Sequence, residues 1–139
     1  MGLIAEARKG GSAETRHLVE AGLSERVIGC CIKVHRTLGP GFLEKVYEEA
    51  LGLELTKAGL GYERQKAVNI LYDGKSIGEH RLDLLVENRV VLELKAAKGI
   101  EDIHLATARS YLKATNLPLA LVVNFAKPTV EIKRVVQTK

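Results

Sequence analysis

Aromatic residues are scarce in this chain of 139 residues: they make up 4% of it, and tryptophan is absent. Proteins that bind single-stranded nucleic acid stack bases on aromatic side chains, so we do not expect a base-stacking platform. No apolar run approaches the roughly 18 residues of a membrane-spanning helix. The basic and then apolar segments of a secretory signal are also missing at the start. We therefore expect a cytoplasmic protein that makes no membrane contact.

Cysteine is also rare, and its placement excludes two kinds of site. Cys30 and Cys31 are the two cysteines, and they are adjacent. Neighbouring cysteines rarely bond to each other, and no CxxC pair or Cys/His set with zinc spacing occurs. Because both lie in an apolar segment, we expect buried free thiols in a reducing compartment.

The overall composition is that of an ordinary globular domain, with 46% hydrophobic and 27% charged residues. The formal net charge is +4. This mildly basic balance is compatible with a polyanionic partner, and equally with a solvated surface that carries a slight lysine excess.

The apolar pattern changes period along the chain. Residues 1–22 contain a Gly-Gly-Ser stretch with weak periodicity, which predicts a loosely ordered lead-in before a single domain at 23–139. The first helix is expected to be capped by Ser24 and stopped by LGPG at 38–41. A second helix should span about 42–58. Its inward-facing row is predicted to comprise Leu43, Val46, Ala50 and Leu53.

The pattern then becomes strand-like. AVNILYDGKSIGEH, at 67–80, predicts two strands around an Asp73-Gly74 turn. RLDLLVENRVVLELKA, at 81–96, completes the second strand and adds a third. A helix at 101–115, a buried strand at 119–125 and a more exposed strand at 129–136 follow. The predicted order, α-α-β-β-β-α-β-β, is that of an α/β (α+β) domain.

Three charged residues interrupt the most hydrophobic part of the chain: Asp83, Glu93 and Lys95. Glu93 and Lys95 share one face of a strand because side chains alternate. Converging carboxylates repel unless a cation lies between them, and Mg²⁺ prefers oxygen ligands. A nearby lysine can orient or deprotonate a water. The set suits metal-assisted phosphodiester hydrolysis. The alternative is a hairpin edge whose charges discourage aggregation.

The loop between the two strands decides whether the acids meet. A two-residue turn would make Glu93 face away from Asp83, whereas a three-residue loop at 87–89 pairs the two. We predict the three-residue loop, or an equivalent bulge, because it also aligns the apolar residues. The core face would then comprise Leu82, Leu84, Val86, Val90, Leu92 and Leu94.

Two motifs resemble a known family. Asp83, nine further residues and then Glu93-Leu94-Lys95 resemble the D…(D/E)xK signature of the PD-(D/E)xK nuclease superfamily. HRTLGPGFLEKVYEEAL contains Gly41-x-x-Glu44-x-x-Tyr47, the pattern that names the GxxExxY protein family. The resemblance runs from about Ser24 to Val136. It implies a restriction-endonuclease-like core, with a mixed β-sheet flanked by helices, and nuclease activity that uses Mg²⁺ or Mn²⁺.

The resemblance also implies roles for individual residues. Asp83 and Glu93 would bind the metal, Glu44 would complete its shell, and Lys95 would act on the attacking water. For Glu44 the alternative is a carboxylate favoured by the positive end of its helix. Tyr47 is expected in the core with its hydroxyl satisfied.

A further set of polar residues is expected near the substrate. Related nucleases often carry a glutamine four residues before a tyrosine on the later helix. Here Thr107 precedes Tyr111, and it cannot offer an amide. We expect Arg81, His104 and Tyr111 to contact nucleic acid. Surface positions are the alternative for Arg81 and His80, and a solvent-exposed position is the alternative for His104.

Two functions fit these residues. The first is a magnesium-dependent nuclease, favoured by the complete Asp-Glu-Lys set. The second is a catalytically weak or inactive module that binds nucleic acid or protein, favoured by Thr107 and the modest charge. Since so small a chain offers one face to a duplex, we expect cleavage of both strands to need a two-fold homodimer.

Overall fold

The computed structural model describes residues 18–137, and their elements follow the predicted order. Most of the predicted lead-in at 1–22 lies outside the described residues. The elements are α3 (Ala21–Leu38), α4 (Glu44–Lys57), β1 (Tyr62–Tyr72), β2 (Lys75–Val86), β3 (Val90–Lys95), α5 (Asp102–Thr115), β4 (Leu119–Asn124) and β5 (Glu131–Val136). Across this described part, no helix is long and apolar enough to cross a membrane.

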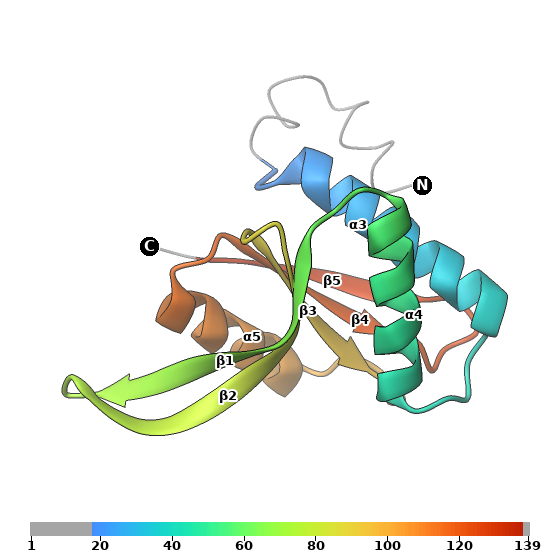
Figure 1. The fold of residues 1–139 in the computed structure, drawn as a ribbon. Coiled ribbons are helices and arrows are strands. Elements are labelled where there is room, and N and C mark those ends of the chain that lie inside the picture. Colours follow the sequence, from blue (N-terminus) through green and yellow to red (C-terminus); the bar gives the residue numbers. More distant parts are fainter. Residues whose placement is uncertain (1–17, 138–139) are drawn as a thin grey trace.

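The strands form one mixed sheet in the order β1-β2-β3-β4-β5 (Figure 1). β3 and β4 are parallel, and the other neighbouring pairs are antiparallel. A parallel pair needs a crossover connection, and α5 supplies it between β3 and β4. The mixed sheet flanked by helices is therefore confirmed.

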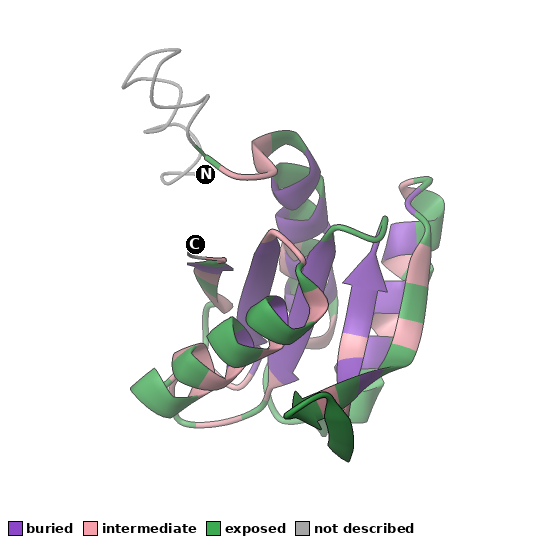
Figure 2. Cartoon of the chain, turned by 90° about the vertical axis from the view of Figure 1, so that its left-hand side faces the viewer, coloured by how far each residue is buried: buried purple, intermediate pink, exposed green. Residues whose placement is uncertain are grey.

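β1 and β2 form a long hairpin that projects from the body of the molecule (Figure 1). The predicted turn is confirmed: Asp73 and Gly74 have φ angles of 54° and 75°. Two successive positive φ values are those of the tight turn whose twist suits a hairpin. Residues around the tip are exposed, in contrast to the central strands (Figure 2).

The core is divided between the two faces of the sheet. One cluster packs α3 and α4 against Leu84, Val86 and Leu92, among others. The other packs α5 against a second set of strand residues that includes Leu82 and Leu85. The predicted continuous face was therefore wrong at Leu82, which lies on the α5 side. The cause is a break in the regular alternation of β2 at Asp83, the next residue, which contacts β3 through its side chain.

The predicted inward row of α4 was also wrong. Leu43 and Leu53 are 80% and 66% exposed, whereas the buried side includes Tyr47 and Leu55. Glu48 is buried as well because its carboxylate has two partners on β1. It accepts hydrogen bonds from Arg64 (3.0 Å) and Gln65 (2.9 Å). The buried side is a second apolar row, in which Tyr47, Leu51 and Leu55 repeat every four residues, and Glu48 lies beside it with its carboxylate satisfied.

α3 begins at Ala21, so Ser24 is not its cap. Ser24 is buried inside the helix, and its hydroxyl accepts a hydrogen bond of 2.8 Å from Arg134 on β5. The hydrogen bond from Arg134 thus explains why a serine is tolerated at this buried position of the helix. Cys30 and Cys31 are buried free thiols, as predicted, and burial raises the pKa of both.

Tyr47 lies in the core, as predicted, and anchors the connection between α3 and α4. Its ring stacks on Phe125 with centroids 4.4 Å apart. Its hydroxyl donates to the Gly39 carbonyl (2.6 Å) and accepts from the Phe42 N–H (3.2 Å). Gly39 and Gly41 have φ angles of 70° and 115°, which favour glycine. The tight turn and the buried hydroxyl together place the start of α4.

Tyr47→Phe should lower the free energy of unfolding by about 1–2 kcal/mol, because it removes the hydroxyl from two backbone partners but keeps the ring stack. Chemical denaturation measures the change. Tyr72→Phe, at a position 71% exposed, is the matched control and should leave stability unchanged. Equal stability of Tyr47→Phe and the native protein would contradict this account of the turn.

Candidate active site

The hairpin between β2 and β3 has the predicted three-residue loop. Val86 pairs with Val90, and Leu84 pairs with Leu92. Residues 87–89 are therefore the loop, and Glu87 and Asn88 have φ angles of 53° and 57°. This register is the one that directs Asp83 and Glu93 to the same side of the sheet.

The regular pairing of β2 with β3 stops at Leu84, immediately before the site. Asp83 then contacts β3 through its side chain: Oδ2 accepts the N–H of Leu94 at 2.7 Å. β1 is irregular at the same level, because Gln65 has a φ angle of 53° between two regular pairs with β2. The strands thus separate where the carboxylate lies, and the Asp83 side chain satisfies a backbone donor of β3.

Glu93 is buried beside Asp83, at 7% exposure. Burial is the main cause that raises the pKa of Glu93 to about 8, and the charge of Asp83 and a side-chain hydrogen bond with it act in the same direction. Lys95 opposes this shift. Without a cation, the two carboxyl groups therefore share a site that suits one negative charge better than two.

Lys95 is half-buried at the end of β3, next to Asn124 of the parallel strand β4. Its positive charge acts on two neighbours: it partly opposes the rise in the pKa of Glu93, and it contributes to the lowered pKa of His80, where burial is the larger cause. The structure therefore brings the predicted Asp-Glu-Lys set together.

Glu44 is exposed at the first turn of α4 and reaches the end of β3. Its Oε2 accepts the N–H of Ala96 at 3.1 Å, directly after Lys95. Within residues 18–137, no group of three or more His, Cys, Asp or Glu side chains is arranged to hold a metal ion. The hydrogen bond to Ala96 places Glu44 near the end of β3, where Lys95 lies. Its role as a third metal ligand stays a prediction.

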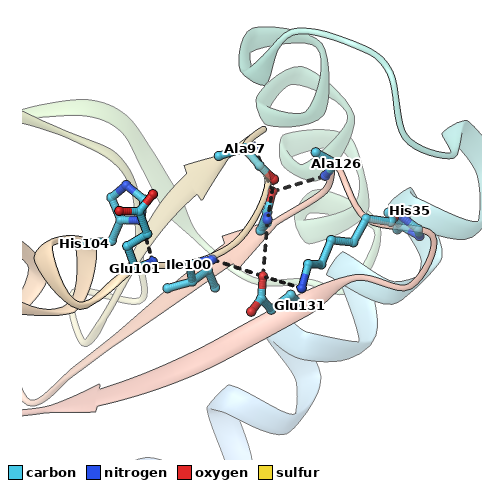
Figure 3. Close-up of polar contacts among 9 residues, drawn as sticks. His35, Ala97, Ile100, Glu101, His104, Ala126 and Glu131 are labelled. Carbon is cyan, nitrogen blue, oxygen red and sulfur yellow. Dashed lines mark hydrogen bonds and ion pairs between the residues drawn. The ribbon is translucent and has the colours of Figure 1, made fainter.

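The three residues predicted to contact nucleic acid lie in different surroundings. Arg81 is exposed and donates to the Gln65 carbonyl at 3.1 Å. His104 closes a capping box at the start of α5, where Nδ1 accepts the Glu101 N–H at 2.9 Å (Figure 3). Tyr111 packs inside the site, as described next. The contacts of all three residues with nucleic acid stay predictions. For His104, capping the start of α5 is by itself a sufficient structural role.

His80 is a site residue that sequence reasoning placed only near phosphate or on the surface. Its Nε2 lies 3.3 Å from Glu93 Oε1. Its ring stacks on Tyr111 with centroids 3.7 Å apart and planes 14° apart. Strict alternation along β2 would put His80 and Asp83 on opposite faces. The irregularity at Asp83 brings both to the α5 side, so no periodic signal in the sequence could have found this contact.

Asn124 was predicted only as part of a buried strand, and it holds the loop that follows Lys95. The side chain is fully buried. Its Oδ1 accepts the N–H groups of Ala97 and Ala126, each at 3.1 Å, and its Nδ2 donates to the Ala97 carbonyl at 2.8 Å. Nδ2 also donates to Glu131, which accepts the N–H of Ile100 (Figure 3). This network fixes the backbone between β3 and α5.

Glu93 should make the metal-free protein less stable as the pH rises. Its folded pKa of about 8 lies above the ordinary 4.5, so between these values the folded state binds more protons than the unfolded chain. The contribution of Glu93 is complete below about pH 4.5 and is lost as the pH rises through about 8. Urea denaturation with a chelator, across this range, measures the decline.

Glu93→Gln should flatten that decline, because the amide cannot ionise. Glu63→Gln, at an exposed position of β1, is the matched control and should keep the native pH dependence. A Glu93→Gln protein whose stability falls as steeply as that of the native chain would contradict the assigned pKa.

Comparisons with known proteins agree with this fold. The crystal structure of a protein named SSO0001 is similar to the chain, with a TM-score of 0.55 and 18% sequence identity. The match covers 69% of this chain, which spans about half (51%) of that structure. At this identity the likeness concerns the fold. No curated protein matches the chain.

The family comparison covers most of the sequence. Residues 21–135 match the PD-(D/E)XK nuclease superfamily. This span runs from the first residue of α3 to the penultimate residue of β5 and includes Asp83, Glu93 and Lys95. The chain therefore belongs to the PD-(D/E)XK nuclease superfamily.

Proposed function

We propose that this chain is a nuclease that hydrolyses phosphodiester bonds in nucleic acid with the help of Mg²⁺ or Mn²⁺. The observation that carries the proposal is the meeting of Asp83 and Glu93, at the end of regular β2–β3 pairing, with Lys95 close by. Superfamily membership supports the same reaction class. The pattern Gly41-x-x-Glu44-x-x-Tyr47 further supports placement in the GxxExxY family.

The residues present fit a hard divalent cation. Both acids offer oxygen donors, which Mg²⁺ and Mn²⁺ prefer. Burial and mutual repulsion raise the pKa of Glu93 to about 8 without a cation. A cation would relieve the cost of ionising both acids. Asp83 and Glu93 would hold it, with Glu44 as the candidate third ligand. When bound, it would stabilise the negative charge that develops on the phosphate and lower the pKa of a water.

Lys95 would act on the water and on the transition state. Its side chain starts two residues after Glu93 on the same face of β3. An ammonium there can orient the attacking water and stabilise the charge that grows on the phosphate oxygens. The Asn124 network fixes the backbone that follows Lys95 and so supports its position.

A second candidate is a module that keeps the fold and binds nucleic acid or protein with little or no chemistry. Two observations favour it. Thr107 stands where relatives often have glutamine, and among the described residues no three-ligand cluster is formed. Metal binding and cleavage separate the two candidates.

A two-fold homodimer is proposed as the arrangement that cuts both strands of a duplex.

The nuclease proposal predicts a melting temperature that rises with Mg²⁺ or Mn²⁺, because a ligand of the folded state stabilises it. The gain is about 2.7 kcal/mol at a metal concentration 100 times the dissociation constant. Asp83→Asn and Glu93→Gln should abolish the rise, whereas Glu63→Gln should keep it. Calorimetry that finds no binding to the native chain at millimolar metal would favour the module.

Lys95→Ala should slow cleavage by about 10²–10⁴-fold at saturating substrate while metal binding persists, because the ammonium acts on the chemical step. Lys98→Ala, three residues further along the chain and exposed, is the matched control. Cleavage of a labelled duplex and of labelled single strands measures the rate. Full activity in a purified Lys95→Ala sample would place the chemistry elsewhere.

A further inference from the structure

The imidazole of His80 connects three elements at the candidate site. It comes from β2, its Nε2 lies 3.3 Å from the Glu93 carboxylate of β3, and its ring stacks on Tyr111 of α5. The His80 side chain is 31% exposed and that of Glu93 is 10% exposed. The Glu93 side of the contact is therefore shielded from water, which strengthens a hydrogen bond to it.

The two acids of the site are held by different partners. The Leu94 N–H donates to Asp83 Oδ2 at 2.7 Å. For Glu93, a side-chain partner is His80, whose Nε2 lies 3.3 Å from Oε1. A carboxylate that is to bind a cation needs its oxygens directed at the site, and the imidazole N–H of His80 is placed to hold Glu93 in that direction.

The stack with Tyr111 fixes the direction of this donor. The ring planes are 14° from parallel with centroids 3.7 Å apart, so the imidazole cannot rotate freely about its bond to Cβ. An imidazole has an N–H on at least one of its two nitrogens, so Nε2 of the fixed ring can act as the donor to Glu93.

We propose that His80 is a positioning residue: stacked on Tyr111, it donates its Nε2 hydrogen to Glu93 and keeps the carboxylate directed at the site. The proposal rests on the proposed function, in which Glu93 binds a cation. Hydrogen-bonded neighbours of metal ligands typically contribute 10–100-fold to metal affinity or activity. His80 would belong to this group without touching the metal or the substrate.

The test compares variants that separate the ring from the donor. His80→Phe keeps a ring on Tyr111 and removes the N–H, whereas His80→Gln keeps an N–H donor and removes the ring. Tyr111→Phe keeps the stack and removes a hydroxyl. We expect His80→Phe to lower Mn²⁺ affinity, measured by calorimetry, by about 10–100-fold. His80→Gln should recover part of this loss, and Tyr111→Phe should bind Mn²⁺ like the native chain.

A purely structural role gives a different result. It would lower the melting temperature of metal-free His80→Phe and His80→Gln alike and leave Mn²⁺ affinity unchanged in both. Native Mn²⁺ affinity in His80→Phe, or no difference between His80→Phe and His80→Gln, would overturn the proposal.

Failure of the proposed function can be recognised separately. If the native chain binds no Mn²⁺, the proposed function fails, and crystal structures of the native chain and His80→Phe decide the role of His80. We expect the Glu93 carboxylate to keep its place in the native chain and to leave it in His80→Phe. An unmoved carboxylate in the variant would overturn the proposal.

Discussion

The hydrogen bond from the Leu94 N–H to the Asp83 carboxylate is the contact on which the site depends. At 2.7 Å, it satisfies a backbone donor of β3 at the point where β2 stops pairing regularly. An unpaired donor in this buried strand would cost about 1–3 kcal/mol. The Asp83 carboxylate thus allows β2 and β3 to separate, and this separation lets the side chains of Asp83 and Glu93 lie side by side between the strands and α5.

β1 takes part in the same irregularity. Gln65 adopts a left-handed backbone conformation, which costs a non-glycine residue about 1–2 kcal/mol. Two contacts offset that cost: Gln65 donates to Glu48 at 2.9 Å, and its carbonyl accepts from Arg81 at 3.1 Å. Glu48 lies on the buried side of α4, so this hydrogen bond connects the helix to the distorted strand beside Asp83.

On the other side of the site, β4 supplies the support. Asn124 binds both polar backbone groups of Ala97 and connects to Glu131, which in turn holds Ile100. The loop between Lys95 and α5 is thereby fixed by side chains from a strand that is far along the chain. α5 then places Tyr111 against His80. Glu93 is thus contacted from β2, and β4 holds the loop that follows Lys95.

The sequence by itself determined the order of elements, the loop at 87–89 and the meeting of Asp83 with Glu93, because hydrophobic periodicity and the family motifs are local signals. It did not determine the inward side of α4, the partner of Ser24, or the contact between His80 and Glu93. The inward side of α4 depends on which of two apolar rows packs against the sheet. The other two contacts depend on polar residues satisfied across elements, and on one break in the alternation of β2 that moves the residues before Asp83 to the opposite face. The alternation of side chains can be predicted from the sequence of one strand. That the Asp83 carboxylate of β2 accepts the Leu94 N–H of β3, in place of a backbone carbonyl, is decided only when the two strands lie side by side.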